Sequence, residues 1–320
     1  MAVKPAENHI LSVRTRCSFP LFKHSESKVT HDVLQEWLKV LGSENAELIK
    51  RASVHSGLFQ RFEAIRYIFL ACDKLRMPCE VKYVATDLFD RFMIKHSQDL
   101  YDHVKNSDSD HKQREFQRIQ KRVKKQLILR IISCCQIASK LAAHYTVIST
   151  MKARRYLLEA GYRYNPESIL QSEMRVLKTL DFKLATASPL LFVEILLEIL
   201  AQSDENLKVE QYHPKAIRFL DLLFLRCEDI PHKFLLKPAG QLKESSGNLN
   251  ELQVVKMNKV LISSSVIIAA VYSVDQESTD KVIKLLLKMT DLSESNILDL
   301  STCLLEIVLE KYKIASPSSV

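Results

Sequence analysis

The feature that most limits the fold of this chain is the apolar stretch at residues 127–145 (LILRIISCCQIASKLAAHY). Wound as an α-helix, its apolar side chains cover most of the circumference, so the helix belongs in the core of a helical domain. The polar side chains Ser133, Gln136, Lys140 and His144 share one wedge, about 80° wide. Because an unpaired buried charge costs several kcal/mol, Lys140 must reach water or meet an acceptor.

A second charge, Glu173, lies inside the apolar stripe of another predicted helix. Asn165 and Pro166 have the residue types of an N-cap and a first helical position, and the helix SILQSEMRVLKTL follows them. A carboxylate within such a stripe should be paired or used, because its desolvation alone is costly. Two interpretations stay open. Lys140 and Glu173 either form a salt bridge within one domain or stand at the rim of an apolar surface that contacts a partner protein.

Composition argues against an enzyme. The 320 residues include only 5 glycines, and neither GxGxxG nor GxxxxGK[ST] occurs. No Ser, His and Asp set, no Cys and His pair and no metal-ligand spacing stands out, so we expect no catalytic residue, metal or cofactor. The longest candidate membrane span, Val260 to Val274, is well short of the roughly 20 residues that a membrane helix needs, so no membrane contact is expected.

The order of segments predicts an all-α chain of two tandem helical bundles, the second more divergent. The expected units are a flexible tail (1–29), a first domain (30–187) with a basic insertion around 96–125, a second helical domain (188–312) and a short tail (313–320). We expect the first helix to start after Thr30 and end at Gly42, and a later one to run from about Glu80 to Lys95. The polar residues 96–111 then form a loop, and Ser188-Pro189 and Pro214 each start a helix.

Much of the net charge of +8 lies in residues 112–125 (KQREFQRIQKRVKK), which hold seven Lys or Arg and one Glu. As a helix, this segment places five basic side chains on one side, and they are candidates for contact with phosphates or an acidic partner: Arg114, Arg118, Lys121, Arg122 and Lys125. The alternative is a solvated basic face that leads into the core helix.

Three strings, in this order, resemble the second, third and fifth helices of the first cyclin box. They are FDRFM (89–93), QIASKLAA (136–143) and LQSEMRVLKTLDFKL (170–184). The resemblance to the cyclin superfamily covers most of residues 30–312 and is weaker after about residue 205. In cyclins that bind kinases, the Lys of the ASK string and the Glu of the fifth helix contact the kinase. The resemblance therefore implies a kinase interface at Lys140 and Glu173, to which we add Gln136.

Within the superfamily, the chain is most similar to proteins of meiotic prophase that promote crossover designation and maturation at late recombination sites. This similarity implies a regulatory scaffold in the nucleus, on meiotic chromosomes, with a cyclin-dependent kinase and recombination or crossover factors as partners and weak contact with chromatin or nucleic acid. Two alternatives are a kinase-independent adaptor for recombination or ubiquitin-ligase factors, and a nucleic-acid-binding module with a cyclin fold.

Overall fold

The computed structural model describes residues 20, 22, 29–106, 112–142, 146–184, 187–228, 230 and 254–315, with the backbone alone for 311–315. All regular secondary structure in these ranges is helical, as predicted. The first helices are α1 (His31–Lys50), α2 (Phe62–Lys74), α3 (Cys79–Lys105), α4 (Lys112–Ala142), α5 (Thr150–Glu159) and α6 (Pro166–Thr179). The others are α7 (Pro189–Ser203), α8 (Val209–Leu225), α11 (Lys259–Val274), the 3₁₀ turn η1 (Gln276–Ser278), α12 (Thr279–Met289) and α13 (Glu294–Ala315).

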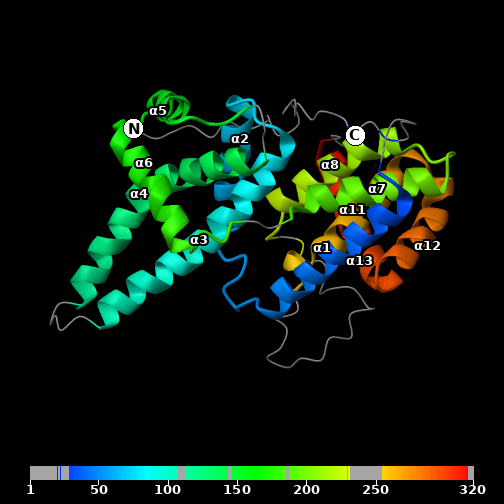
Figure 1. Cartoon of the computed structure of the whole chain (residues 1–320), viewed down its shortest axis with the longest axis horizontal. Coiled ribbons are helices and arrows are strands. Elements are labelled where there is room, and N and C mark those ends of the chain that lie inside the picture. The colour runs from blue at the N-terminus through cyan, green and yellow to red at the C-terminus, as the bar shows by residue number, and fades with distance from the viewer. Residues whose placement is uncertain are drawn as a thin grey trace, which may run out of the picture.

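The helices form two bundles that lie side by side (Figure 1). The first consists of α2 to α6, and the second of α7, α8, α11, α12 and α13. Helix α1 packs on α7 and α11, so it lies against the second bundle although it precedes the first in sequence. The tandem arrangement is confirmed, whereas the domain limits at 30–187 and 188–312 stay a prediction.

Each bundle is built around one helix that is apolar on nearly all sides. In α4 every residue from Leu129 to Ser139 is buried, and in α11 every residue from Leu261 to Val271. Helix α4 packs on α2, α3, α5 and α6, and α11 packs on α7, α8, α12 and α13. A helix without a polar face is stable in water only when neighbours cover it, which is why these two stretches organise the fold.

Local capping chemistry sets several helix starts where the sequence predicted them. Asn165 accepts a hydrogen bond from the backbone N–H of Ser168 at 2.7 Å, and Ser188 accepts one from Leu191 at 3.2 Å. In both helices a proline follows the cap and occupies the first turn.

Two predicted helix limits are wrong. Helix α1 continues through Gly42, because Asn45 beyond it bonds the backbone at the start of α11. The Asn45 amide donates to the Met257 carbonyl and accepts from the Lys259 N–H, each at 2.9 Å. These contacts offset the cost of about 1 kcal/mol for a glycine in a helix. Pro214 does not start a helix but lies inside α8, which begins at Val209 with buried side chains in its first turn.

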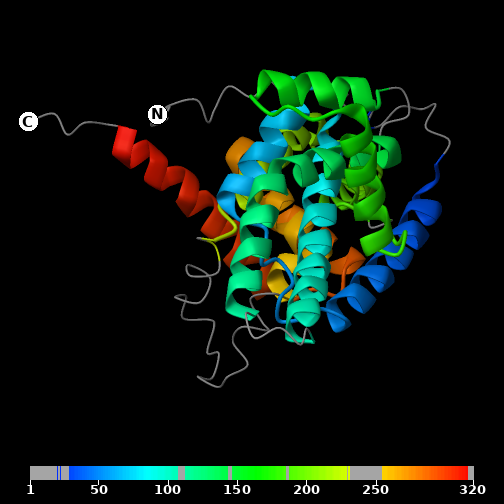
Figure 2. The ribbon, with the colours of Figure 1, turned by 90° about the vertical axis from the view of Figure 1, so that its left-hand side faces the viewer.

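The predicted loop at 96–111 is also wrong in part, because α3 continues to Lys105 and α4 begins at Lys112. The two helices run antiparallel beyond the rest of the first bundle, and Figures 1 and 2 show them side by side. We call residues 96–106 and 112–126 the arm. Val104 is buried in it and Ile119 and Val123 are half-buried, so a narrow apolar seam holds two otherwise polar helices together.

A buried ion pair joins the bundles. The ammonium of Lys82 on α3 lies 2.6 Å from a carboxylate oxygen of Asp221 on α8, and the Tyr83 hydroxyl donates to the same carboxylate at 2.7 Å. The Lys82 ammonium also lies 4.9 Å from the centre of the Phe69 ring, and Phe224 of α8 packs on both Phe69 and Tyr83. This contact fixes the relative position of the two bundles.

Most of the two predicted tails lies outside the described residues. In the N-terminal one, Phe22 is buried and packs edge-on against His213 of α8, with ring centres 5.4 Å apart. Within the described part of the chain, no helix has the length and apolar character that a bilayer crossing requires.

Candidate functional site

Lys140 and Glu173 meet where the last turn of α4 lies against the middle of α6. The ammonium nitrogen of Lys140 is 2.5 Å from Oε1 of Glu173. The Lys140 side chain is 51% exposed and that of Glu173 only 8%, so a buried carboxylate holds a cation that still faces water. The salt bridge within one domain is therefore formed, and the cation remains accessible to a partner.

A buried polar seam below this pair sets the register of the two helices. The hydroxyl groups of Ser133 and Ser172 lie 2.7 Å apart. The Arg130 guanidinium donates to the Ser172 hydroxyl at 2.7 Å and to the Gln126 side chain at 2.9 Å. Burial lowers the pKa of Arg130 to about 10, and the nearby charge of Arg175 adds to the shift. These bonds hold α4 and α6 in the register that places Lys140 beside Glu173.

Sequence reasoning missed Arg130 and Ser172. The signal was an arginine flanked by Leu129 and Ile131 in the most apolar stretch of the chain, which requires a buried acceptor just as Lys140 does.

Gln136, which we expected at a kinase interface, is in the core. Its side chain is 0% exposed, and Nε2 donates to the Ile148 carbonyl at 3.4 Å. Ser139 accepts from the Ile148 N–H at 2.9 Å and donates to the Gln136 carbonyl at 2.8 Å. Ser133 and Gln136 of the polar wedge therefore face inward, and Gln136 bonds the segment before α5. The Gln136 side chain is not exposed and cannot contact a partner directly. His144 lies outside the described residues.

Four exposed apolar side chains lie on α4 and α6, which carry the ion pair, or on the turn that follows α6. We call them the rim: Leu141, Leu170, Met174 and Phe182. Leu141 follows Lys140 directly, and Leu170 and Met174 lie within about 100° of Glu173 around the axis of α6. Such side chains, on or directly after the helices that carry one charged pair, have the composition of a protein-binding site.

Phe182 is presented by a turn in an unfavourable backbone conformation. Asp181 and Phe182 have φ values of 51° and 57°, which cost roughly 1 kcal/mol or more each in residues with a side chain. Two cations of α3 hold this turn. Lys95 pairs with the Asp181 carboxylate at 2.5 Å, and Arg91 donates to the carbonyls of Lys183 at 2.8 Å and Leu184 at 3.1 Å. Phe182 is 61% exposed, so the fold sustains the strain without burying the ring.

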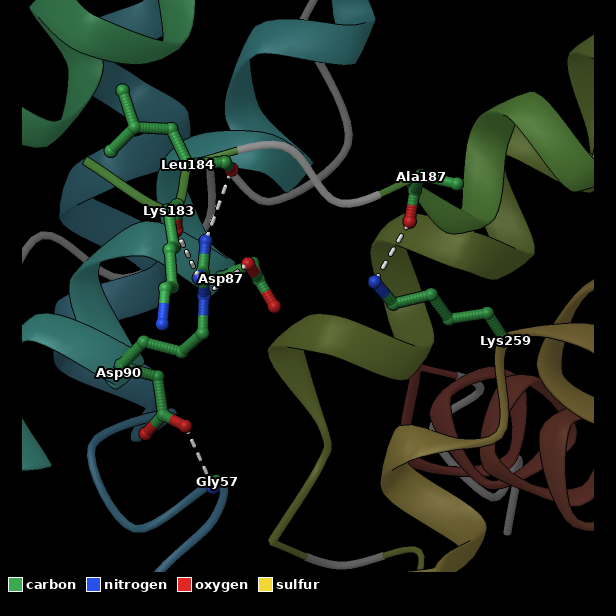
Figure 3. A network of polar contacts seen from close by, with 8 residues as sticks. Gly57, Asp87, Asp90, Lys183, Leu184, Ala187 and Lys259 are labelled. Carbon is green, nitrogen blue, oxygen red and sulfur yellow. Dashed lines mark hydrogen bonds and ion pairs between the residues drawn. The ribbon is translucent and has the colours of Figure 1, made fainter. Parts of the chain in front are cut away.

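The string FDRFM acts as an anchor on α3, and Figure 3 shows the hydrogen bond of its Asp90 to Gly57. Phe89 and Phe92 are buried, while Arg91 holds the segment after α6 and is itself paired with Asp87 at 2.9 Å. Asp90 accepts the N–H groups of Gly57 at 2.7 Å and Phe59 at 2.8 Å, and so fixes the loop before α2. Burial raises the pKa of Asp90 to about 6, although these two hydrogen bonds act in the opposite direction.

In the same view, Lys259 of α11 donates to the carbonyl of Ala187 at 2.8 Å, just before α7 (Figure 3). Burial lowers the pKa of Lys259. The connection between the bundles is thus held from both sides, by α3 and by α11.

The five basic candidates lie elsewhere. Arg114, Arg118, Lys121, Arg122 and Lys125 are all exposed on the first half of α4. Lys125 is separated from Lys140 by about 22 Å of helix, so the basic row and the ion pair are two distinct surfaces. Among the described residues, no group of three His, Cys, Asp or Glu side chains could hold a metal ion; Asp108 and Asp110 lie outside this part of the chain.

The comparisons with known proteins agree with this geometry. A family model, described as the N-terminal domain of cyclins, matches residues 43–185, which include α2 to α6 and hence both members of the ion pair. Over 279 residues the chain is 27% identical to Cyclin N-terminal domain-containing protein 1 of Mus musculus and 25% identical to the protein of that name from Homo sapiens. Each match covers 87% of this chain and 84% of the relative. The all-α fold, the ordered strings and these matches together show that the chain has a cyclin-like fold and that residues 43–185 form a cyclin N-terminal domain.

Proposed function

We propose that this protein is a cyclin-like regulatory subunit, without catalytic activity of its own, that binds a cyclin-dependent kinase through Lys140, Glu173 and the rim. The observation that carries the proposal is the half-exposed ammonium of Lys140, which a buried carboxylate holds in place among exposed apolar side chains. The resemblance to kinase-binding cyclins, in which the Lys and Glu at the matching positions contact the kinase, supports this proposal.

The chemistry of the pair suits this role. An ammonium has three N–H donors and Glu173 uses one of them, so Lys140 can donate to a carbonyl or carboxylate of the kinase while the salt bridge stays intact. Because Glu173 already orients the side chain, less conformational entropy is lost on binding. The rim would supply the apolar contact area that binding energy requires.

We propose that the complex acts in the nucleus, on meiotic chromosomes, where it promotes crossover designation and maturation together with recombination or crossover factors. Similarity over most of the chain to the two mammalian relatives supports this role. A cyclin-like regulator is the general function that the family supports, and the meiotic role is the specific form of it that we propose.

The alternative is an adaptor that works without a kinase. The observation in its favour is the ion pair itself, because a charge satisfied inside the domain has no need of a partner.

Affinity purification of the tagged protein from meiotic tissue, followed by mass spectrometry, tests the proposal. We expect a cyclin-dependent kinase to be recovered with the wild type and lost with the charge-swapped double variant Lys140→Glu/Glu173→Lys, which should stay folded with a melting temperature at most a few degrees below that of the wild type. Recovery of crossover factors without any kinase from either protein would contradict the proposal and support the adaptor.

A further inference from the structure

The arm carries a basic surface that kinase binding does not use. Arg114, Arg118, Lys121 and Lys125 lie within about 60° of one another around the axis of α4. They form a straight row about 16 Å long. The arm extends beyond the rest of the first bundle (Figures 1 and 2), and all four side chains of the row are exposed.

The charges of this row are not neutralised within the part of the chain that the structure describes. Lys82, Lys95 and Lys140 each have a carboxylate partner. By contrast, no ion pair with a described residue is formed by the row or by two neighbouring cations, Arg122 and Lys124.

Further cations, Arg130 and Arg175, lie near His96 at the base of the arm. The pKa of His96 is lowered to about 4, chiefly by burial and further by the charges of Arg130, Arg175 and Arg122. Asp99 acts in the opposite direction and does not outweigh them. A surface with this excess of positive charge attracts polyanions.

The side chains around the row indicate which polyanion it suits. On one side of the row, the adjacent positions of α4 hold exposed amides and one more cation, namely Gln113, Gln117, Gln120 and Lys124; on the other side they hold Arg122 and the carboxylate of Glu115. The exposed aromatic residue Phe116 points about 160° away from Arg114. A protein partner needs an apolar centre, which this face lacks, whereas nucleic-acid interfaces are polar and strongly positive.

The same residues favour a duplex over a single strand. Proteins that bind single strands stack the bases on aromatic side chains, and the basic face has none. The wide major groove of B-form DNA admits a helix whose long side chains reach phosphates, but the deep, narrow major groove of A-form RNA does not. We propose that the arm binds duplex DNA through the phosphate backbone. The grounds are that the row forms no ion pair with a described residue, that it is straight, and that no apolar or aromatic side chain of α4 lies beside it.

This second site is independent of the kinase surface. It lies about 22 Å along α4 from Lys140. A protein with both surfaces can hold a kinase at one end of α4 and DNA at the other.

The test is fluorescence anisotropy with a labelled 20-base-pair DNA duplex and the full chain, at salt concentrations from 50 to 200 mM. The arm variant is Arg114→Gln/Arg118→Gln/Lys121→Gln/Lys125→Gln. The matched control, Lys39→Gln/Arg218→Gln/Lys284→Gln/Lys288→Gln, removes the same charge from exposed residues outside the arm. All eight positions are exposed, so both variants should keep the circular dichroism and melting temperature of the wild type.

Four phosphate contacts predict that wild-type affinity falls about 150-fold over this salt range, with a slope of log affinity on log salt of about −3.6. The arm variant should lose this slope and most of its affinity at 50 mM salt, while the control keeps both. No binding by the wild type at 50 mM salt would overturn the proposal. Equal losses in the two variants would do the same, as would tighter binding to single-stranded DNA, duplex RNA or polyglutamate than to the DNA duplex.

Discussion

The ammonium of Lys140 donates a hydrogen bond to the carboxylate of Glu173 at 2.5 Å and so joins the end of α4 to the middle of α6. The sequence left open whether these charges face each other or a partner. The structure shows that they face each other, and that half of the Lys140 side chain remains in water. An internal salt bridge and a contact surface are therefore compatible at this position.

The salt bridge should contribute modestly to stability. Each single reversal, Lys140→Glu or Glu173→Lys, places two like charges side by side, and we expect it to lower the free energy of unfolding by about 1–2 kcal/mol. The double variant restores an opposite pair and should recover at least half of that loss. Urea unfolding of the four proteins measures the coupling. A double variant no more stable than the weaker single one would show that the two charges do not interact.

Substitutions in the ion pair between the bundles should lower the free energy of unfolding more, and the loss should differ between the two partners. Lys82 is 5% exposed and Asp221 21%. Asp221→Ala leaves the ammonium buried without its carboxylate and should cost about 3 kcal/mol. Lys82→Met keeps most of the volume and leaves Asp221 bonded to the Tyr83 hydroxyl, so a loss of about 1 kcal/mol is expected.

Urea unfolding of the variants checks this order, with Lys50→Met as the control. Lys50 pairs with Glu47 on the surface of α1, where the two side chains are 72% and 50% exposed, so this change should cost less than about 0.5 kcal/mol. If Lys82→Met were the most destabilising of the three variants, our account of the buried pair would be wrong.

Glu80, in the first turn of α3, should make stability depend on pH. Burial raises its pKa from 4.5 to about 7, although a hydrogen bond from Ser188 acts in the opposite direction. The folded protein thus holds this proton more tightly than the unfolded chain. The contribution to stability is fully present below pH 4.5 and is lost as the pH rises through 7.

The variant Glu80→Gln isolates this effect from other titrating groups. The free energy of unfolding of the wild type minus that of the variant should fall by about 3 kcal/mol between pH 4.5 and pH 8. Urea unfolding at several pH values measures the difference. A difference that stays constant or rises with pH would contradict the raised pKa.

Local chemistry made several helix starts predictable. Asn165 and Ser188 each supply a side-chain oxygen to an N–H three residues later, and the proline that follows needs no hydrogen-bond donor at its position. These contacts lie within four residues of sequence, so the sequence contains all the information. The buried stretches of α4 and α11 were predictable for a similar reason, since their composition alone excludes a polar face.

Contacts between distant segments account for the errors. Gly42 ends no helix because Asn45 bonds the start of α11, more than 200 residues later in sequence. Gln136 is buried because the polar wedge of α4 faces the segment before α5. Phe182 could not be placed at the site, since its exposure depends on how Lys95 and Arg91 of α3 hold the turn after α6. A helical period shows which side chains share a face but not what covers that face.

Substitutions in the rim test whether this surface binds a cyclin-dependent kinase. The variant Leu170→Glu/Met174→Glu changes two exposed positions of α6, and the control Leu298→Glu/Leu309→Glu changes two exposed positions of α13 in the second bundle. The measurement is recovery of the kinase with the tagged protein from meiotic tissue, for variants whose melting temperatures match the wild type. We predict that the rim variant recovers less than about a tenth of the wild-type kinase, a loss of more than 1.4 kcal/mol of binding free energy, while the control recovers all of it. Equal recovery of the kinase by the rim variant and the control would contradict the account.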